Sequence, residues 1–82
     1  MTKQEIQEKV TEFMIDRLEY DANVLKPEAE LKRDLGMSSL DAVEMAIFIK
    51  RTFGFQPERN AIKMIVNLQD LYDYIGEQIN LF

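Results

Sequence analysis

Apolar residues recur every three or four positions along most of this chain, which is the spacing of amphipathic helices. The first such stretch predicts a helix from about Lys3 to Leu18, with Thr2 and Glu5 forming a capping box at its start. Its apolar stripe consists of Ile6, Val10, Phe13, Met14 and Leu18. Charged residues occupy the opposite face, so we expect one side to be buried and the other to be solvated.

A second helix is predicted from about Ser39 to Phe53. At about 100° per residue, a broad apolar arc is formed by Ala42, Val43, Met45, Ala46, Ile49 and Phe53. The remaining arc contains Asp41, Glu44, Arg51 and Thr52, with Phe48 among them and Leu40 and Ile47 on its border. This helix should therefore have a buried side and a mixed side that faces solvent.

Two further helices are predicted in the last third of the chain. The first, roughly Asn60 to Ile65, is short and nearly all apolar, so we expect it to be wedged between larger helices. The second runs from about Leu68 to Ile79, with Asn67 and Asp70 at its cap. Its inner stripe is Leu68, Leu71, Tyr72, Ile75 and Ile79. The tail, Asn80 to Phe82, either folds back onto the first helix or frays.

The segment from Glu19 to Arg33 has no sustained period and contains Asn23 and Pro27, which predicts a long loop with at most a short turn of helix. Its expected anchors are Tyr20, Val24, Leu25, Leu31 and Leu35. The predicted fold is therefore all-α: a four-helix up-and-down bundle of three longer helices and a short third one. It has a long loop between the first two helices and forms a single domain over residues 1–82.

Composition narrows the possible functions. The net charge is −5 and the pI is near 4.6, which disfavours nucleic-acid binding and favours protein partners with basic surfaces. The chain contains no cysteine and no histidine, so it has no thiol of its own and lacks the usual general base and the commonest metal ligand. We expect no catalytic residues and no metal site. Neither a signal-peptide pattern nor a run of membrane-spanning length is present, so a cytoplasmic location without membrane insertion is the default expectation.

The most informative stretch is residues 34–41, which read DLGMSSLD. Gly36 allows a sharp turn, and Ser38 with Asp41 forms a variant capping box at the start of the second helix. Ser39 then occupies the first helical position, with its hydroxyl pointing outward. A phosphate attached there would lie near unpaired N–H donors and the positive end of the helix dipole.

This stretch resembles the hallmark of the acyl carrier protein family, Asp-Leu-Gly-x-Asp-Ser-Leu-Asp. The resemblance continues through Val43, Glu44, Phe53, Gly54 and Pro57 to a closing segment from Ile65 to Ile75, so it covers essentially the whole chain. It implies that Ser39, and not Ser38, carries a 4′-phosphopantetheine group derived from coenzyme A. It also implies a non-enzymatic carrier of acyl thioesters in fatty acid or related biosynthesis, such as polyketide or specialised acyl pathways.

The resemblance also implies two surfaces. Partner docking is expected at Leu40, Asp41, Glu44 and Ile47, while Phe48 is either a contact residue or ordinary surface. An acyl pocket is expected at Val43, Ala46, Ile49, Ile62, Ile65 and Leu71, positions that also suit an ordinary core. The implied partners of the monomeric carrier are a phosphopantetheinyl transferase and acyl-loading, condensing and tailoring enzymes with basic docking patches.

Several residues depart from the family pattern. Ser38 replaces the usual Asp, and Lys50, Arg51 and Thr52 replace a run of Glu, which suggests a specialised carrier with its own enzymes. Three alternatives remain open. The cargo could be an aminoacyl, peptidyl or D-alanyl group, the chain could be a helical adaptor that is never modified, or, least favoured, it could bind nucleic acid.

Overall fold

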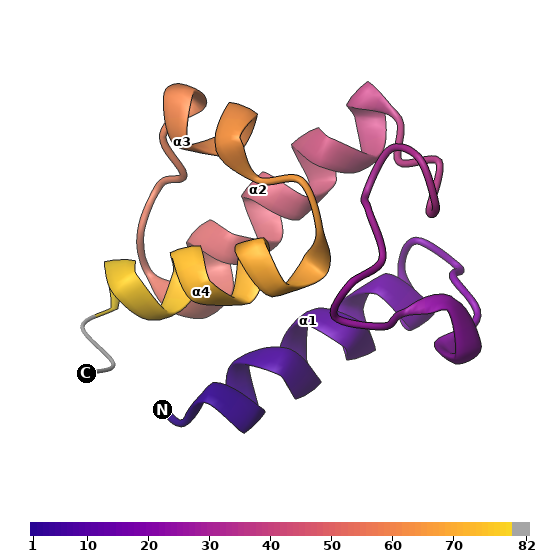
Figure 1. Cartoon of the computed structure of the whole chain (residues 1–82). Helices are drawn as coiled ribbons and strands as arrows, with labels where there is room; N and C mark the ends of the chain where they lie inside the picture. Colours follow the sequence, from indigo (N-terminus) through magenta and orange to yellow (C-terminus); the bar gives the residue numbers. More distant parts are fainter. Residues whose placement is uncertain (80–82) are drawn as a thin grey trace.

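The computed structural model describes residues 1–79, which form an all-helical fold (Figure 1). Its elements in chain order are α1 (Lys3–Asp16), the 3-10 turn η1 (Ala22–Val24), α2 (Ser39–Phe53), α3 (Arg59–Met64) and α4 (Leu68–Gln78). Extended pairing within residues 1–79 is limited to one isolated bridge between Glu30 and Asn67. The predicted all-α class is confirmed. Both ends of α2 and the starts of α1 and α4 match the prediction, and the other helix ends differ from it by one or two residues, which is typical of terminal turns.

Three of the four helices begin at a reciprocal capping box. Thr2 and Glu5 cap α1, Ser38 and Asp41 cap α2, and Asn67 and Asp70 cap α4, each pair exchanging side-chain to backbone hydrogen bonds. The short α3 has Glu58 at its N-cap position and no side-chain cap bond. The starts of the long helices are therefore specified locally by the sequence, as predicted.

The core lies between α1 and α4, which run side by side, and is completed by the inner face of α2 (Figure 1). The five most deeply buried large side chains belong to α1 and α4: Ile6, Val10, Met14, Leu68 and Ile75. Met45 and Ile49 are the buried residues of α2. Burying a side chain of this size stabilises the fold by roughly 1.5–3 kcal/mol, so these stripes outweigh helix propensity in holding the bundle together.

The long connection between α1 and α2 is held against the start of α4 by backbone hydrogen bonds. The Leu68 N–H donates to the Ala29 carbonyl at 3.1 Å, and the Leu31 N–H donates to the Val66 carbonyl at 2.9 Å. Four of the five predicted anchors pack on the core: Leu25 and Leu35 are buried, and Tyr20 and Leu31 are half-buried. The prediction for Val24 was wrong, because the 3-10 turn directs this side chain outward, where it is 45% exposed.

The expectation that the third helix is wedged between larger ones was also wrong. No residue of α3 is buried, Met64 is 79% exposed, and Ile62 is exposed as well. A six-residue helix can cover its neighbours with one side only, so the remaining apolar side chains of α3 face solvent. Contact with the core comes instead from Ile65, the residue after the helix. The predicted behaviour of residues 80–82 lies outside the described residues.

Candidate functional site

A tight turn precedes α2 and fixes where that helix begins. The Leu35 N–H donates to the Glu30 carbonyl at 3.1 Å, and the Met37 N–H donates to the Leu31 carbonyl at 2.9 Å. Gly36 has φ +59°, in the left-handed region that a residue with a Cβ rarely occupies. Its predicted role in the turn is confirmed.

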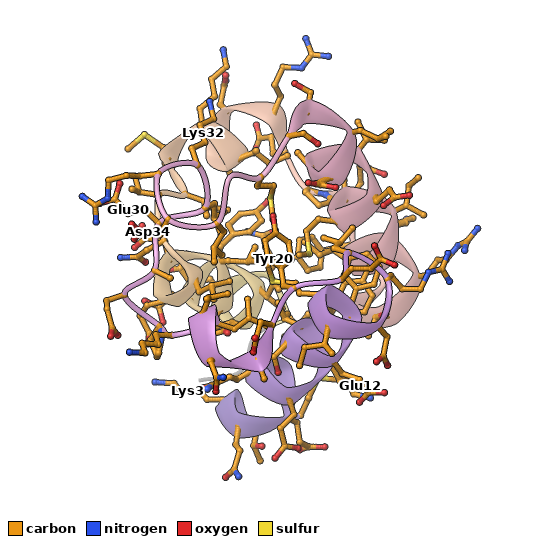
Figure 2. The ribbon with its side chains drawn as sticks, turned by 90° about the vertical axis from the view of Figure 1, so that its right-hand side faces the viewer. Lys3, Glu12, Tyr20, Glu30, Lys32 and Asp34 are labelled. Atoms are coloured by element: carbon orange, nitrogen blue, oxygen red, sulfur yellow. The ribbon has the colours of Figure 1, made fainter. Side chains whose placement is uncertain are left out.

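Asp34 closes this turn with its side chain. Its carboxylate accepts a hydrogen bond from the Glu30 N–H at 2.8 Å, and the Arg33 guanidinium donates to it at 3.1 Å. The hydrogen bonds from Arg33 and from the Glu30 N–H hold the pKa of Asp34 below its ordinary value. Arg33 also pairs with the Glu30 carboxylate at 3.0 Å. Glu30 and Asp34 lie together at one edge of the molecule (Figure 2), so this polar cluster shapes the loop that leads into α2.

The first turn of α2 places two neighbouring serines in different roles. The Ser38 hydroxyl accepts from the Asp41 N–H at 3.1 Å, and the Asp41 carboxylate accepts from the Ser38 N–H at 3.2 Å. Ser39 is the first helical residue, is exposed, and makes no side-chain hydrogen bond within residues 1–79. The capping bonds therefore occupy Ser38 and leave the Ser39 hydroxyl free at the positive end of the helix dipole.

Tyr20 comes from the long connection and lies near this end of α2. Burial raises the pKa of Tyr20, and the negative charge of Asp41 raises it further. Tyr20 is half-buried, and Figure 2 shows it near the centre of that view, with charged side chains around the rim. The sequence identified Tyr20 only as an apolar anchor. Its proximity to Asp41 depends on how the loop folds back, so no local pattern could have revealed it.

The outer face of α2 carries a mixture of apolar and acidic side chains. Leu40 is 70% exposed, Ile47 is 47% exposed, and Glu44 is exposed, as the sequence predicted for this face. Asp41 is half-buried because its carboxylate is engaged in the cap. Val43 also lies on this outer face and is 56% exposed.

Phe48 forms part of an aromatic cluster on the side of the bundle. Its ring stacks on Phe13 with centroids 4.3 Å apart, and meets the edge of Phe53 at 5.9 Å. Phe48 is half-buried as a result. It therefore contributes to packing between α1 and α2, while one side of the ring remains accessible.

A small cavity of about 60 Å³ lies where α2, α3 and α4 meet. Five of the six predicted pocket residues line it: Ala46, Ile49, Ile62, Ile65 and Leu71. The placement of Val43 in the pocket was wrong. The buried face of α2 covers a narrower range of angles around the helix axis than the apolar arc predicted from the sequence. The buried face is centred on Met45 and Ile49, and Val43 falls outside it.

Five further residues line the cavity and were not predicted: Leu31, Ala42, Met45, Pro57 and Tyr74. Ala42 and Met45 share a helical face with Ala46 and Ile49, and the sequence had already placed them on the apolar arc of this helix without assigning them to the pocket. Tyr74 is positioned by tertiary contacts, since its hydroxyl accepts from the Glu58 N–H at 3.0 Å and its ring meets Phe55 edge-on. No local pattern in the sequence indicates that arrangement.

A larger hollow elsewhere on the molecule has a different character. A groove of about 710 Å³ between α1 and α4 is lined mainly by amide and charged side chains, including Gln4, Gln7, Gln69 and Asp73. Such a mixed surface suits a hydrocarbon chain less well than the small cavity beside α2, whose lining is almost wholly apolar.

Residues 1–79 contain no group of three or more carboxylate, histidine or cysteine side chains arranged to hold a metal ion. In this same range, no helix is both long and apolar enough to cross a bilayer.

Comparison with known proteins adds to this geometry. Residues 8–75 match the family described as "Phosphopantetheine attachment site". The chain is 33% identical over 73 residues to an acyl carrier protein of Phytoplasma mali (strain AT), covering 89% of this chain and 87% of that protein. It is 36% identical over 70 residues to an acyl carrier protein of Syntrophus aciditrophicus (strain SB), covering 85% and 88%. It is 34% identical over 79 residues to one of Guillardia theta, covering 96% and 98%.

Similarity at this level over nearly the full length of both chains agrees with the all-helical fold and with the free hydroxyl at the start of α2. Members of this family are carriers and not enzymes. They bear a covalently attached 4′-phosphopantetheine and interact with a transferase and with biosynthetic enzymes. The chain belongs to the acyl carrier protein family.

Proposed function

We propose that Ser39 is the residue to which 4′-phosphopantetheine is attached. The observation that carries this proposal is the contrast between two adjacent serines. Both serines are exposed, but the Ser38 hydroxyl is committed to the cap, whereas the Ser39 hydroxyl has no partner within residues 1–79. Ser39 also matches the serine before Leu in the family's loop.

The residues around Ser39 fit a phosphodiester at this position. The backbone N–H groups of the first turn of α2 and the helix dipole favour a negative charge there. The cap formed by Ser38 and Asp41 keeps this turn ordered. The attached group supplies a flexible arm that ends in a thiol, the functional group that this chain lacks. Tethering the cargo in this way raises its effective concentration at each partner's active site.

We further propose that the cavity beside α2 receives the end of an acyl cargo. The support is its apolar lining, which includes Ala46, Ile49 and Ile65. At about 60 Å³, the cavity holds roughly two waters' share of liquid volume, so it accommodates only a short hydrocarbon segment at rest. A longer chain would have to part α3 from α2, and the shallow packing of α3 makes this the least costly opening.

The pathway that fits this carrier is fatty acid biosynthesis or a related acyl pathway, in the cytoplasm and as a monomer. Support comes from the acyl carrier relatives and from the acidic residues next to Ser39 on α2. We propose that basic patches of loading, condensing and tailoring enzymes dock on the outer face of α2 around Leu40, Asp41, Glu44 and Ile47. Exposed charge pairs are each worth about 0–1 kcal/mol, so this docking should be weak, fast and sensitive to salt.

Intact-mass spectrometry tests the attachment site. The purified chain is incubated with coenzyme A and a phosphopantetheinyl transferase of broad specificity, alongside Ser39→Ala and Ser38→Ala. The proposal expects a single adduct on the wild-type chain and on Ser38→Ala, and none on Ser39→Ala. An adduct on Ser39→Ala would place the attachment elsewhere, and no adduct on any chain would favour an unmodified adaptor. Mass analysis of the native protein would then identify the cargo and separate acyl from aminoacyl groups.

A further inference from the structure

Tyr74 of α4 is the one residue in the lining of the small cavity whose side chain carries a polar group. Its ring is half-buried, and its hydroxyl accepts a hydrogen bond from the Glu58 N–H at 3.0 Å. The same ring meets Phe55 edge-on, with the two ring centroids 5.7 Å apart. One side chain of α4 therefore contacts both the cavity and the connection that leads into α3.

The start of α3 depends on this contact. Glu58 is the N-cap residue of α3, and its own side chain makes no cap hydrogen bond. Within residues 1–79, the bond from the Glu58 N–H to Tyr74 is the only hydrogen bond that joins residues 55–60 to another element. Because α3 buries none of its residues while Ile62 lines the cavity, α3 is a thinly packed cover whose start is positioned by Tyr74.

The segment just after α3 is held by two hydrogen bonds at Val66. The Val66 carbonyl accepts from the Leu31 N–H at 2.9 Å, and the Val66 N–H donates to the Asp70 carboxylate at 3.0 Å. The start of α3 has one such bond and its end has two, so separating Glu58 from Tyr74 is the less costly way to widen the cavity.

We propose that Tyr74 determines how long an acyl chain the cavity accepts, by holding the start of α3 in place through its hydrogen bond to Glu58. The inference rests on the proposed function, because it takes this cavity as the acyl site. A chain that ends within the resting cavity leaves the bond intact, whereas a longer chain has to break it. A neutral hydrogen bond changes an equilibrium by about two- to tenfold, so Tyr74 should disfavour long chains by a factor of this size.

Tyr74→Phe tests this role, because it removes the hydroxyl and keeps the ring that contacts Phe55. Tyr72→Phe is the matched control. It removes a hydroxyl from the same helix that has no hydrogen-bond partner within residues 1–79, and Tyr72 does not line the cavity. The two variants and the wild-type chain are loaded by a phosphopantetheinyl transferase from butyryl-, octanoyl- or dodecanoyl-coenzyme A. The rate of thioester cleavage by hydroxylamine then measures how well each cargo is shielded.

The expected result depends on chain length. Octanoyl and dodecanoyl thioesters should be cleaved about two- to tenfold more slowly on Tyr74→Phe than on the wild-type chain, because the cavity opens more readily to receive them. Butyryl thioesters should be cleaved at the same rate on both chains, and Tyr72→Phe should match the wild type at every length. A general loosening of the fold would instead change all three rates alike.

The same hydrogen bond can be removed from the donor side. Proline has no N–H, and Glu58 has φ −83°, close to the value that proline imposes, so Glu58→Pro removes the donor at a compatible position. Glu58→Ala is its control, since it loses the same charge and keeps the N–H. Glu58→Pro should reproduce the slower cleavage of the long thioesters, and Glu58→Ala should not.

Amide hydrogen exchange on the unmodified chains tests the contact without any cargo. Exchange at Ile62 and Ile65 should be about two- to tenfold faster in Tyr74→Phe than in Tyr72→Phe, because the start of α3 is released more often. Unchanged exchange would overturn the proposal whether or not Ser39 can be loaded.

The cleavage rates separate the two ways of failing. If long thioesters are shielded on the wild-type chain and Tyr74→Phe gives the same rates, or Tyr72→Phe gives the same change, the role of Tyr74 is refuted and the acyl cavity stands. If no thioester is shielded on any chain, the proposed acyl cavity is refuted, and selection by chain length falls with it.

Discussion

Replacing each of the two serines at the start of α2 with alanine should separate stability from modification. Ser38→Ala removes the hydroxyl that accepts from the Asp41 N–H at 3.1 Å and leaves that donor without its cap. Loss of an N-cap of this type costs about 1 kcal/mol. For a domain of this size, 1 kcal/mol corresponds to a fall in Tm of roughly 4–8 °C.

Ser39→Ala provides the internal control. Its hydroxyl makes no hydrogen bond within residues 1–79, and its side chain is exposed. Alanine is a better helix former than serine, so Tm should stay the same or rise slightly. Thermal unfolding followed by circular dichroism, on unmodified protein at one pH and salt concentration, measures both variants.

The result that would refute this reasoning is equally definite. If Ser38→Ala melted within about 1 °C of wild type while Ser39→Ala lost several degrees, the assignment of the cap would be reversed. Ser39 would then be the structural serine, and the proposed attachment site would lose the observation that carries it. Ser38→Asp extends the test, because aspartate caps as well as serine does and should preserve Tm.

Four other changes probe the rest of the structure. Gly36→Ala should lower the free energy of unfolding by about 1–2 kcal/mol in urea denaturation. The cost comes from backbone strain at φ +59°, since no atom lies within 4 Å of the new Cβ. Gly36→Asn should lose less stability because Asn tolerates this conformation. Ile75→Ala should lower the free energy of unfolding by about 2–5 kcal/mol in the same assay, because Ile75 is fully buried. Met64→Ala, at an exposed site of α3, should change it very little. Equal losses of stability in the two variants would contradict the observed packing. The depressed pKa of Asp34 contributes stability that is present above its ordinary pKa of 3.8 and is lost as pH falls through the lower folded value. When Tm is measured against pH, it should therefore fall less steeply in acid for Asp34→Asn than for the wild-type chain. An unchanged slope would refute this contribution. Glu44→Lys should slow modification or acyl transfer at low salt. It should leave Tm within a few degrees of the wild-type value, because Glu44 is exposed. A large drop in Tm would show that this face of α2 contributes to the stability of the fold.

Local interactions made much of the fold predictable from the sequence. A capping box joins residues three positions apart, so the starts of α1, α2 and α4 could be predicted from Thr2, Ser38 and Asn67. The positive φ of Gly36 and the stripes on α1 and α4 follow from equally short-range rules. The local cap also placed Ser39 at the first helical position, and the resemblance of residues 34–41 to the family's loop then made Ser39 the candidate attachment residue.

Features that depend on contacts between distant segments were not predictable in this way. A helical wheel shows which apolar residues share a face but not which face another segment covers, and Val43 and Met64 are exposed because none covers them. Tyr74 reaches the cavity through a hydrogen bond to the Glu58 backbone, sixteen residues away. Tyr20 lies near Asp41 only because the long connection folds back across the bundle.

The sequence by itself determined where α1, α2 and α4 begin, which stripes of α1 and α4 are buried, and which hydroxyl is free at the start of α2. The tertiary structure alone decided the width of the buried arc of α2 and the size of the cavity. The physical reason is how far apart along the chain the interacting residues lie. Caps and turns are settled by atoms a few residues apart, whereas exposure and pocket shape depend on which surfaces the rest of the chain covers.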